Sequence, residues 1–159
     1  TPLSESGKAL LILGAAMADY DAATDRDDLE GFASYIFIGE NGVDHAGRSV
    51  AGGTDVDGDG FDDFIIGAPK NDDNGSNAGK TYLFLGAELP ELGTYYMDIA
   101  SYAFVGPEVY DHTGYRVAMP GDIDGDGKAD IVIGNANETP PGTAEDDFNH
   151  DAYLLMSKL

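Results

Sequence analysis

The stretch DHAGRSVAGGTDVDGDGFDDFIIG, residues 44–67, decides the fold, because it returns as DHTGYRVAMPGDIDGDGKADIVIG at residues 111–134, a shift of 67. Two flanking elements repeat as well: 33–40 with 100–108, and 6–14 with 78–86 and, more loosely, 150–156. The 159 residues therefore hold about 2.4 copies of a unit of about 67–72 residues. Self-similarity at a regular spacing indicates a repeat architecture.

Each unit is predicted to contain four short strands, A to D, rich in β-branched and aromatic residues and bounded by Gly, Pro, Asn and Asp. The expected strands are A at 47–51 and 114–118, B at 63–67 and 130–134, C at 8–14, 80–86 and 152–156, and D at 34–39 and 101–106. Along strand C of the complete unit, Tyr82 and Phe84 point to one face and Leu83 to the other. A strand that is apolar on both faces must be covered on both. Small sheets stacked face to face satisfy this, which predicts an all-β fold of β-propeller blades, with a β-sandwich or a β-solenoid as alternatives.

The predicted organisation is a partial repeat with strands C and D at 1–43, a complete repeat at 44–106, and a repeat lacking its last strand at 107–159. Propellers have about four to eight blades, so one such chain cannot close the ring. Open strand edges and uncovered apolar faces are unfavourable. We therefore expect a fragment or a protomer of a larger assembly, in which other chains or copies of the same chain supply the missing strands.

The charge is strongly negative, with 30 Asp and Glu against 8 Lys and Arg and a net charge of −22. Such a chain repels nucleic acids and anionic lipid surfaces and favours cations as partners. The absence of cysteine excludes disulfides and thiolate zinc sites. No apolar run approaches the roughly 20 residues that span a bilayer, so we expect no membrane insertion. Residues 9–18, ALLILGAAMA, resemble the apolar part of a signal peptide, but the internal repeat accounts for this apolar stretch better.

Two acidic loops lie between the expected strands A and B: DVDGDGFDD at 55–63 and DIDGDGKAD at 122–130, both of the pattern D-x-D-x-D-G-x-x-D. Carboxylates at positions 1, 3 and 5 converge when the loop curls, and Gly at position 6 permits the turn. Position 7 can offer its backbone carbonyl, and position 9 adds a carboxylate. The predicted ligands are Asp55, Asp57, Asp59, the Phe61 carbonyl oxygen and Asp63, and Asp122, Asp124, Asp126, the Lys128 carbonyl oxygen and Asp130. Hard oxygen ligands suit Ca²⁺, with Mg²⁺ second, so we expect two calcium sites. The alternative is an acidic turn without metal.

The loops are not EF-hands, although their ligand spacing is similar. An EF-hand carries Glu at position 12 between two helices, whereas Ile66 and Ile133 stand there, within strand-like flanks. This also argues against a dockerin-like helical pair. The loops are therefore predicted to be β-hairpin loops.

With TDVDGDGFDDFIIGAP at 54–69 and GDIDGDGKADIVIG at 121–134, the chain resembles the FG-GAP repeat family over about residues 6–159. HAGRSVA (45–51) corresponds to the "FG" element of the family motif, and IIGAP (65–69) corresponds to its "GAP" element. That family builds the propeller of integrin α subunits and of many bacterial secreted and surface proteins. The resemblance implies calcium on the same loop residues, and ligand recognition on the opposite face, where loops 68–79, 135–151, 40–46 and 107–113 lie. His45 and His112 depart from the pattern, as does Gly134-Asn135-Ala136 in place of "GAP".

The expected function is that of a calcium-binding adhesion, ligand-binding or structural module, extracellular or at the cell surface, where millimolar calcium fills even weak sites. We expect no enzyme, because G-x-S-x-G, P-loop and H-E-x-x-H motifs are absent from the sequence. The Asp–His pairs at 44–45 and 111–112 repeat with the fold and are interpreted as structural turn contacts. Alternatives are a non-catalytic FG-GAP domain of a secreted hydrolase, or a lectin-like carbohydrate-binding propeller. A protein or glycan ligand is expected, without an assignment of its residues; Tyr95 and Tyr96 are interpreted as contacts between blades or as a sugar-stacking platform.

Overall fold

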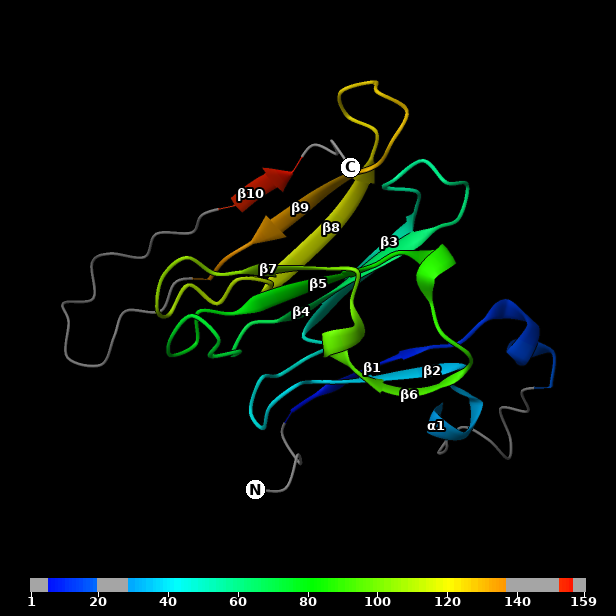
Figure 1. The fold of residues 1–159 in the computed structure, drawn as a ribbon, viewed down its shortest axis with the longest axis horizontal. Coiled ribbons are helices and arrows are strands. Elements are labelled where there is room, and N and C mark those ends of the chain that lie inside the picture. The colour runs from blue at the N-terminus through cyan, green and yellow to red at the C-terminus, as the bar shows by residue number, and fades with distance from the viewer. Residues whose placement is uncertain (1–5, 20–28, 137–151, 156–159) are drawn as a thin grey trace.

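The computed structural model describes residues 6–19, 29–136 and 152–155, and these form three small sheets that lie side by side (Figure 1). The first sheet holds β1 (Lys8–Leu11), β2 (Tyr35–Ile38) and β6 (Gly93–Tyr96). The second holds β3 (Ser49–Thr54), β4 (Asp63–Ala68), β5 (Lys80–Phe84) and β7 (Tyr102–Val105). The third holds β8 (Arg116–Gly121), β9 (Asp130–Gly134) and β10 (Ala152–Leu155). The helical elements are short: α1 (Leu29–Phe32) and the 3-10 turns η1 (Gly14–Asp19), η2 (Gly86–Glu88) and η3 (Met97–Ile99).

The second sheet is the complete four-stranded unit that the repeat predicts. Its order is β3-β4-β5-β7, and each neighbouring pair is antiparallel. The third sheet repeats the first three of these strands, and β1 and β2 repeat the last two. The prediction of an all-β fold made of unclosed propeller blades is therefore confirmed.

Both faces of the second sheet are buried against its neighbours. The first core, between the first and second sheets, consists of Tyr35, Phe37, Ala46, Ile66, Ala68, Tyr82, Phe84 and Met97. The second core, between the second and third sheets, consists of Val56, Ile65, Leu83, Leu85, Ala129, Ile131 and Ile133. Strand β5 is buried over its whole length and alternates between the two cores, as its sequence predicts. Each large apolar side chain buried in this way contributes roughly 1.5–3 kcal/mol.

Two glycines bring the backbones of adjacent sheets together. Gly7 forms a parallel bridge with Ala46, and Gly79 forms the equivalent bridge with Thr113. Both glycines have positive φ, +74° and +81°. A Cβ at Gly79 would lie 2.3 Å from the amide nitrogen of Thr113, so no other residue fits there without moving one sheet away from the next.

We expect Gly79→Ala to destabilise the chain more than Gly53→Ala. Gly53 also has positive φ, +89°, but its Cβ would meet nothing within 4 Å. Both substitutions carry the same backbone strain, and only Gly79→Ala adds a steric overlap, which costs about 1–3 kcal/mol more. Urea unfolding of both variants in calcium measures the difference. Equal losses would show that the Gly79 bridge does not hold the sheets together.

The connection between strands C and D of the complete unit differs from the prediction. Its residues 93–96 form β6. Although this segment connects two strands of the second sheet, it joins the first sheet, where it pairs in parallel with β2. Tyr95 packs against the first core and donates its hydroxyl to the carbonyl of Glu91 at 2.7 Å, whereas Tyr96 is 47 % exposed. Tyr95 is thus a contact between blades, as one of the two interpretations held. The four residues of this strand, GTYY, carry too little periodicity to be distinguished from a loop in the sequence.

The apolar residues 9–18 do not form one continuous element. The strand expected at 8–14 ends at Leu11, and η1 begins at Gly14. In the part of the chain that the structure describes, no helix is long and apolar enough to cross a membrane.

Candidate metal sites

The two acidic loops join β3 to β4 and β8 to β9, and both lie at the same end of the molecule (Figure 1). The strand register shifts just before each loop, as at a β-bulge. The glycines of the two loops adopt the same left-handed conformation: φ is 81° and 93° at Gly58 and Gly60, and 81° and 93° at Gly125 and Gly127. The prediction of two equivalent β-hairpin loops is confirmed.

Three carboxylates converge in each loop. One oxygen from each of Asp55, Asp57 and Asp63 lies within 4.8 Å of the others. Asp122, Asp124 and Asp130 form the matching group. Oxygens bound to one Ca²⁺ at 2.3–2.6 Å are at most about 5 Å apart, so the donor set and its spacing fit this ion.

Backbone amides shape the first carboxylate of each loop. Asp55 Oδ1 accepts from Gly58 at 2.6 Å and from Asp59 at 3.2 Å, and Oδ2 accepts from Gly60 at 2.8 Å. These hydrogen bonds hold the pKa of Asp55 below its usual value, and the bond from the Gly60 amide has the largest effect. Asp122 repeats the arrangement, with the amide of Gly127 as the main cause of its lowered pKa. Both carboxylates are therefore ionised over the whole physiological pH range.

The last carboxylate of the first loop is buried. Asp63 is 1 % exposed and accepts from the amides of Val56 at 2.7 Å and Gly86 at 2.9 Å. Burial raises the pKa of Asp63 and outweighs the two hydrogen bonds, which lower it. The negative charges of Asp57 and Asp55 raise the pKa further. Burying a carboxylate beside like charges is unfavourable unless a cation compensates. Asp130 is the buried counterpart and accepts from the Ile123 amide at 2.7 Å.

Position 5 of each loop lies outside these groups. Asp59 Oδ1 accepts from the amide of Phe61 at 2.8 Å, and Asp126 Oδ1 accepts from the amide of Lys128 at 2.9 Å. The structure thus brings together positions 1, 3 and 9, whereas position 5 caps its own turn. Ligation by Asp59, Asp126 and the two carbonyl oxygens stays a prediction.

The two loops touch each other across the boundary between sheets. The amide of Ala129 donates to the carbonyl of Asp55 at 2.7 Å, and Val56 is buried in the second core beside Ala129. A Cβ on Gly58 would lie 3.5 Å from the side chain of Lys128. The two loops are therefore in direct contact.

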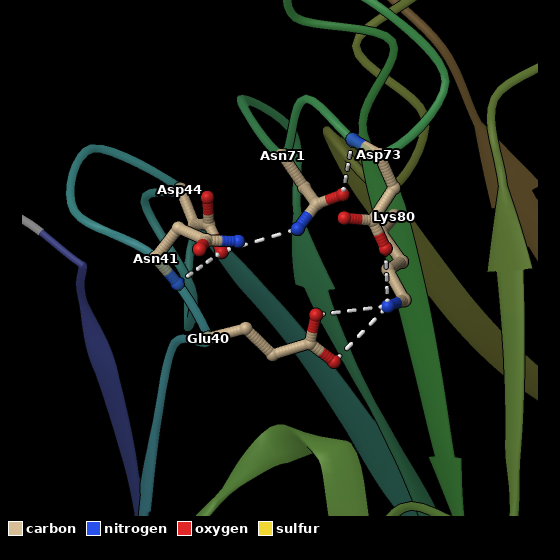
Figure 2. Close-up of polar contacts among 6 residues, drawn as sticks. All are labelled: Glu40, Asn41, Asp44, Asn71, Asp73 and Lys80. Atoms are coloured by element: carbon tan, nitrogen blue, oxygen red, sulfur yellow. Dashed lines mark hydrogen bonds and ion pairs between the residues drawn. The ribbon is translucent and has the colours of Figure 1, made fainter.

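A second polar cluster, not predicted from the sequence, lies in loops 40–46 and 68–79 and at the start of β5 (Figure 2). Lys80 Nζ lies 3.0 Å from both carboxylate oxygens of Glu40 and 2.7 Å from Asp73 Oδ2. Its side chain is 10 % exposed. Burial acts to lower the pKa of Lys80, but the carboxylates of Asp73 and Glu40 outweigh it, and the net shift is upward. One signal was present: Lys80 repeats Lys8, which pairs with the exposed Glu30.

Asp44 fixes the turn beside this cluster (Figure 2). Asp44 accepts hydrogen bonds from the amide of Asn41 at 3.0 Å and from Asn71 Nδ2 at 3.1 Å. Burial raises the pKa of Asp44 and outweighs these two hydrogen bonds, which lower it. Asp111 makes the equivalent turn contact with the amide of Glu108 at 2.9 Å. The histidines that follow, His45 and His112, both have positive φ, 54° and 53°. These contacts agree with a structural role for the Asp–His pairs. Residues 137–151, which complete the second of the B–C loops, lie outside the described residues.

Comparison with known proteins identifies the repeat. Residues 46–84 and 113–146 match the FG-GAP repeat family, and the chain carries FG-GAP repeats. The matched residues include β3–β5 and β8–β9, so the second and third sheets are FG-GAP units of a partial β-propeller.

The chain is also similar to integrin α chains. It is 33 % identical to human integrin alpha-IIb over 112 residues, which is 67 % of this chain and 10 % of that protein. It is 34 % identical to Xenopus laevis integrin alpha-5 over 105 residues, which is 63 % of this chain and 9 % of that protein. The chain spans about a tenth of the length of these curated relatives.

Proposed function

We propose that the chain is a calcium-binding propeller module of an extracellular or cell-surface protein, with an adhesive, ligand-binding or structural role and no enzymatic activity. The observation that carries the proposal is the pair of loops at the same repeat position, each with three converging carboxylates. The similarity to integrin α chains supports the adhesive or ligand-binding role. No observation on the described residues favours the hydrolase-linked or the lectin-like alternative.

The proposed ligands of the first ion are the carboxylates of Asp55, Asp57 and Asp63, with Asp59 and the carbonyl of Phe61 completing the set. Those of the second are the equivalent Asp122, Asp124, Asp126, the carbonyl of Lys128 and Asp130. A bound ion supplies the positive charge that offsets repulsion among the carboxylates and holds each hairpin in shape. Millimolar extracellular calcium fills such sites, whereas submicromolar cytosolic calcium does not, which supports the extracellular location.

The free edges of the sheets support an assembly with further strands. In the second sheet, strand C (β5) lies between strands B and D. In the first sheet, the edge of β1 that strand B would occupy has no partner among the described strands, and an apolar cavity of about 340 Å³ opens there, between β1 and the strands β3 and β4. The organisation that we propose is a partial repeat at 1–43, a complete one at 44–106 and a repeat without its last strand at 107–159. Other chains or copies of this chain would supply the missing strands.

A ligand, protein or glycan, is proposed to bind the face opposite the calcium loops. The ion pairs of Lys80 with Glu40 and Asp73 hold two loops of that face together, which supports a preformed surface.

The native mass in solution tests the proposal. We expect light scattering in millimolar CaCl₂ to give a multiple of 16.7 kDa, and the assembly to dissociate or unfold in EGTA, because the ions hold the hairpins that meet between sheets. A monomer of 16.7 kDa that keeps its fold in EGTA would contradict both the assembly and the structural role of calcium.

A further inference from the structure

Six dipeptides of the chain place an Asp or an Asn directly before a glycine, and all six lie within the described residues. In such a pair the backbone nitrogen of the glycine can approach the side-chain carbonyl carbon of the preceding residue, because no Cβ stands in the way. The pairs are Asn41-Gly42, Asp57-Gly58, Asp59-Gly60, Asn74-Gly75, Asp124-Gly125 and Asp126-Gly127. The dipeptides of the two asparagines are identical, so only the structure can distinguish them.

In five of the six pairs the glycine amide already donates a hydrogen bond. In the four pairs of the acidic loops, the acceptor is the first carboxylate of the loop, Asp55 or Asp122, at 2.6–2.8 Å. In the fifth pair, the amide of Gly75 donates to the carbonyl of Asp72 at 3.0 Å. An amide that is held in this way cannot attack the preceding side chain until its hydrogen bond opens.

The side chain of Asn74 is held as well. Its Nδ2 donates to the carbonyl of Gly106 at 2.9 Å and to the carbonyl of Pro107 at 3.0 Å. Together with the bond of the Gly75 amide, three hydrogen bonds therefore restrain this pair. The fold protects Asn74 from attack by its neighbour.

The pair Asn41-Gly42 lacks this protection. Among the described residues, no group accepts a hydrogen bond from the Gly42 amide or from the side chain of Asn41, which is exposed. Asn41 also borders a polar hollow of about 360 Å³ that admits water and is lined further by Glu40, Tyr96 and Asp98. Both the attacking nitrogen and the water that completes the reaction thus have access to this side chain.

We propose that Asn41 is a site of spontaneous deamidation. The backbone nitrogen of Gly42 loses its proton and forms a bond to Cγ of Asn41, and the side-chain nitrogen leaves as ammonia. Water then opens the resulting succinimide ring at either of its two carbonyl carbons. One opening gives aspartate, and the other gives isoaspartate, in which the main chain runs through Cβ and Cγ. One water is consumed and one ammonia is released, without oxidation or reduction.

The turn that contains Asn41 is joined to the neighbouring loop 68–79 through Asp44 (Figure 2). The carboxylate of Asp44 accepts from the Asn41 amide at 3.0 Å and from Asn71 Nδ2 at 3.1 Å. Its backbone carbonyl accepts from the amide of Lys70 at 3.1 Å. Asp44 therefore connects two loops of the face opposite the calcium loops.

Deamidation alters this turn in two ways. Isoaspartate lengthens the main chain between residue 41 and Asp44 by one carbon atom, and both products add a negative charge beside Glu40, where like charges repel. Val43, inside the turn, has a φ of 72°, which is unfavourable for a β-branched residue, so the turn depends on its hydrogen bonds. The converted turn consequently separates from loop 68–79.

The test compares the two asparagines in the full chain of 159 residues. The chain is incubated in millimolar CaCl₂ at mildly alkaline pH and mapped by mass spectrometry, and an isoaspartate-specific methyltransferase labels the isoaspartyl product. We expect Asn41 to react at least about tenfold faster than Asn74, where three hydrogen bonds must open first. In urea, where both pairs lose their structure, the rates should become similar. Equal rates in the folded chain, faster reaction at Asn74, or an Asn41 that reacts only in urea overturns the proposal.

A variant tests the attacking nitrogen itself. Gly42→Ala places a Cβ beside this nitrogen and should slow the conversion of Asn41 at least about tenfold, without changing the rate at Asn74. Gly42 is not among the glycines with positive φ, so its backbone is compatible with alanine. Thermal unfolding checks the fold, and if the variant does not fold, the comparison of the two asparagines still decides. An unchanged rate at Asn41 in the folded variant overturns the proposal.

Hydrogen exchange measures the effect on the loops. The Lys70 amide should exchange faster in incubated wild type than in fresh protein. Asn41→Gln, incubated in parallel, is the matched control, because glutamine keeps the amide group but cannot close the same ring. Unchanged exchange in converted wild type, or an equal gain in Asn41→Gln, overturns the proposed separation of the loops. The inference depends neither on bound calcium nor on assembly, so it and the proposed function can fail separately.

Discussion

Removal of calcium with EGTA is expected to lower the free energy of unfolding by about 2.7 kcal/mol for each site that was filled at about one hundred times its Kd. The physical reason is that the folded loops bring three carboxylates within 4.8 Å, whereas the unfolded chain does not. Urea unfolding in calcium and in EGTA measures the change. A free energy of unfolding that does not depend on calcium would contradict the proposed sites.

Single substitutions divide this effect between the two loops. Asp57→Asn and Asp124→Asn should each remove one bound ion, counted by isothermal titration calorimetry, and about half of the calcium-dependent stability. In EGTA the same substitutions should be neutral or stabilising, because they relieve repulsion between like charges. This reversal separates a ligand from a residue that is merely structural.

The matched control is Asp62→Asn, which makes the same charge change in the same loop at an exposed residue outside the carboxylate group. It should leave two ions bound. Asp59→Asn decides whether position 5, which caps the Phe61 amide, also binds the ion. A double variant, Asp57→Asn with Asp124→Asn, that still binds two ions would refute the ligand assignment.

Lys80→Met is expected to destabilise the chain by about 2–4 kcal/mol, because it leaves the poorly exposed carboxylate of Glu40 without its partner. Lys8→Met is the control, since Lys8 occupies the same repeat position but pairs with Glu30 at the surface, where about half of each side chain is exposed. An exposed pair contributes at most about 1 kcal/mol. Chemical denaturation of both variants measures the contrast, and similar losses would show that the ion pairs of Lys80 add no stability.

The same pair of proteins gives a pH dependence. The pKa of Lys80 is raised in the folded state above its ordinary 10.5, so the folded state binds the proton more tightly than the unfolded state. The stabilisation is fully present below pH 10.5 and is lost as the pH rises through the folded-state pKa. The difference in unfolding free energy between wild type and Lys80→Met should therefore stay constant from neutral pH to about 10 and shrink above it. A difference that grows at high pH would contradict this assignment.

Features that repeat along the chain were predicted correctly. Strand C showed that Tyr82 and Leu83 face opposite sides, because side chains alternate in any strand, and both faces are buried as a consequence. The spacing of Asp55, Asp57 and Asp63 likewise predicted a loop whose conformation depends on local turns and glycines, and the structure repeats it in the next unit. These properties depend on neighbours within a few residues.

The amino-acid sequence by itself determined the repeat, the face to which each strand residue points, and the hairpin loops. It also determined that the strands are too few to close a propeller ring. Only the tertiary structure decided that β6 pairs with β2, that Glu40 and Asp73 surround Lys80, and that position 5 of each acidic loop lies outside the carboxylate group. Glu40 and Lys80 are separated by 40 residues, and Tyr95 lies opposite Phe37 only because β6 pairs with β2, a strand from a distant part of the chain. Local pattern encodes the conformation of each element, whereas contacts between elements arise from packing, which no short window of sequence contains.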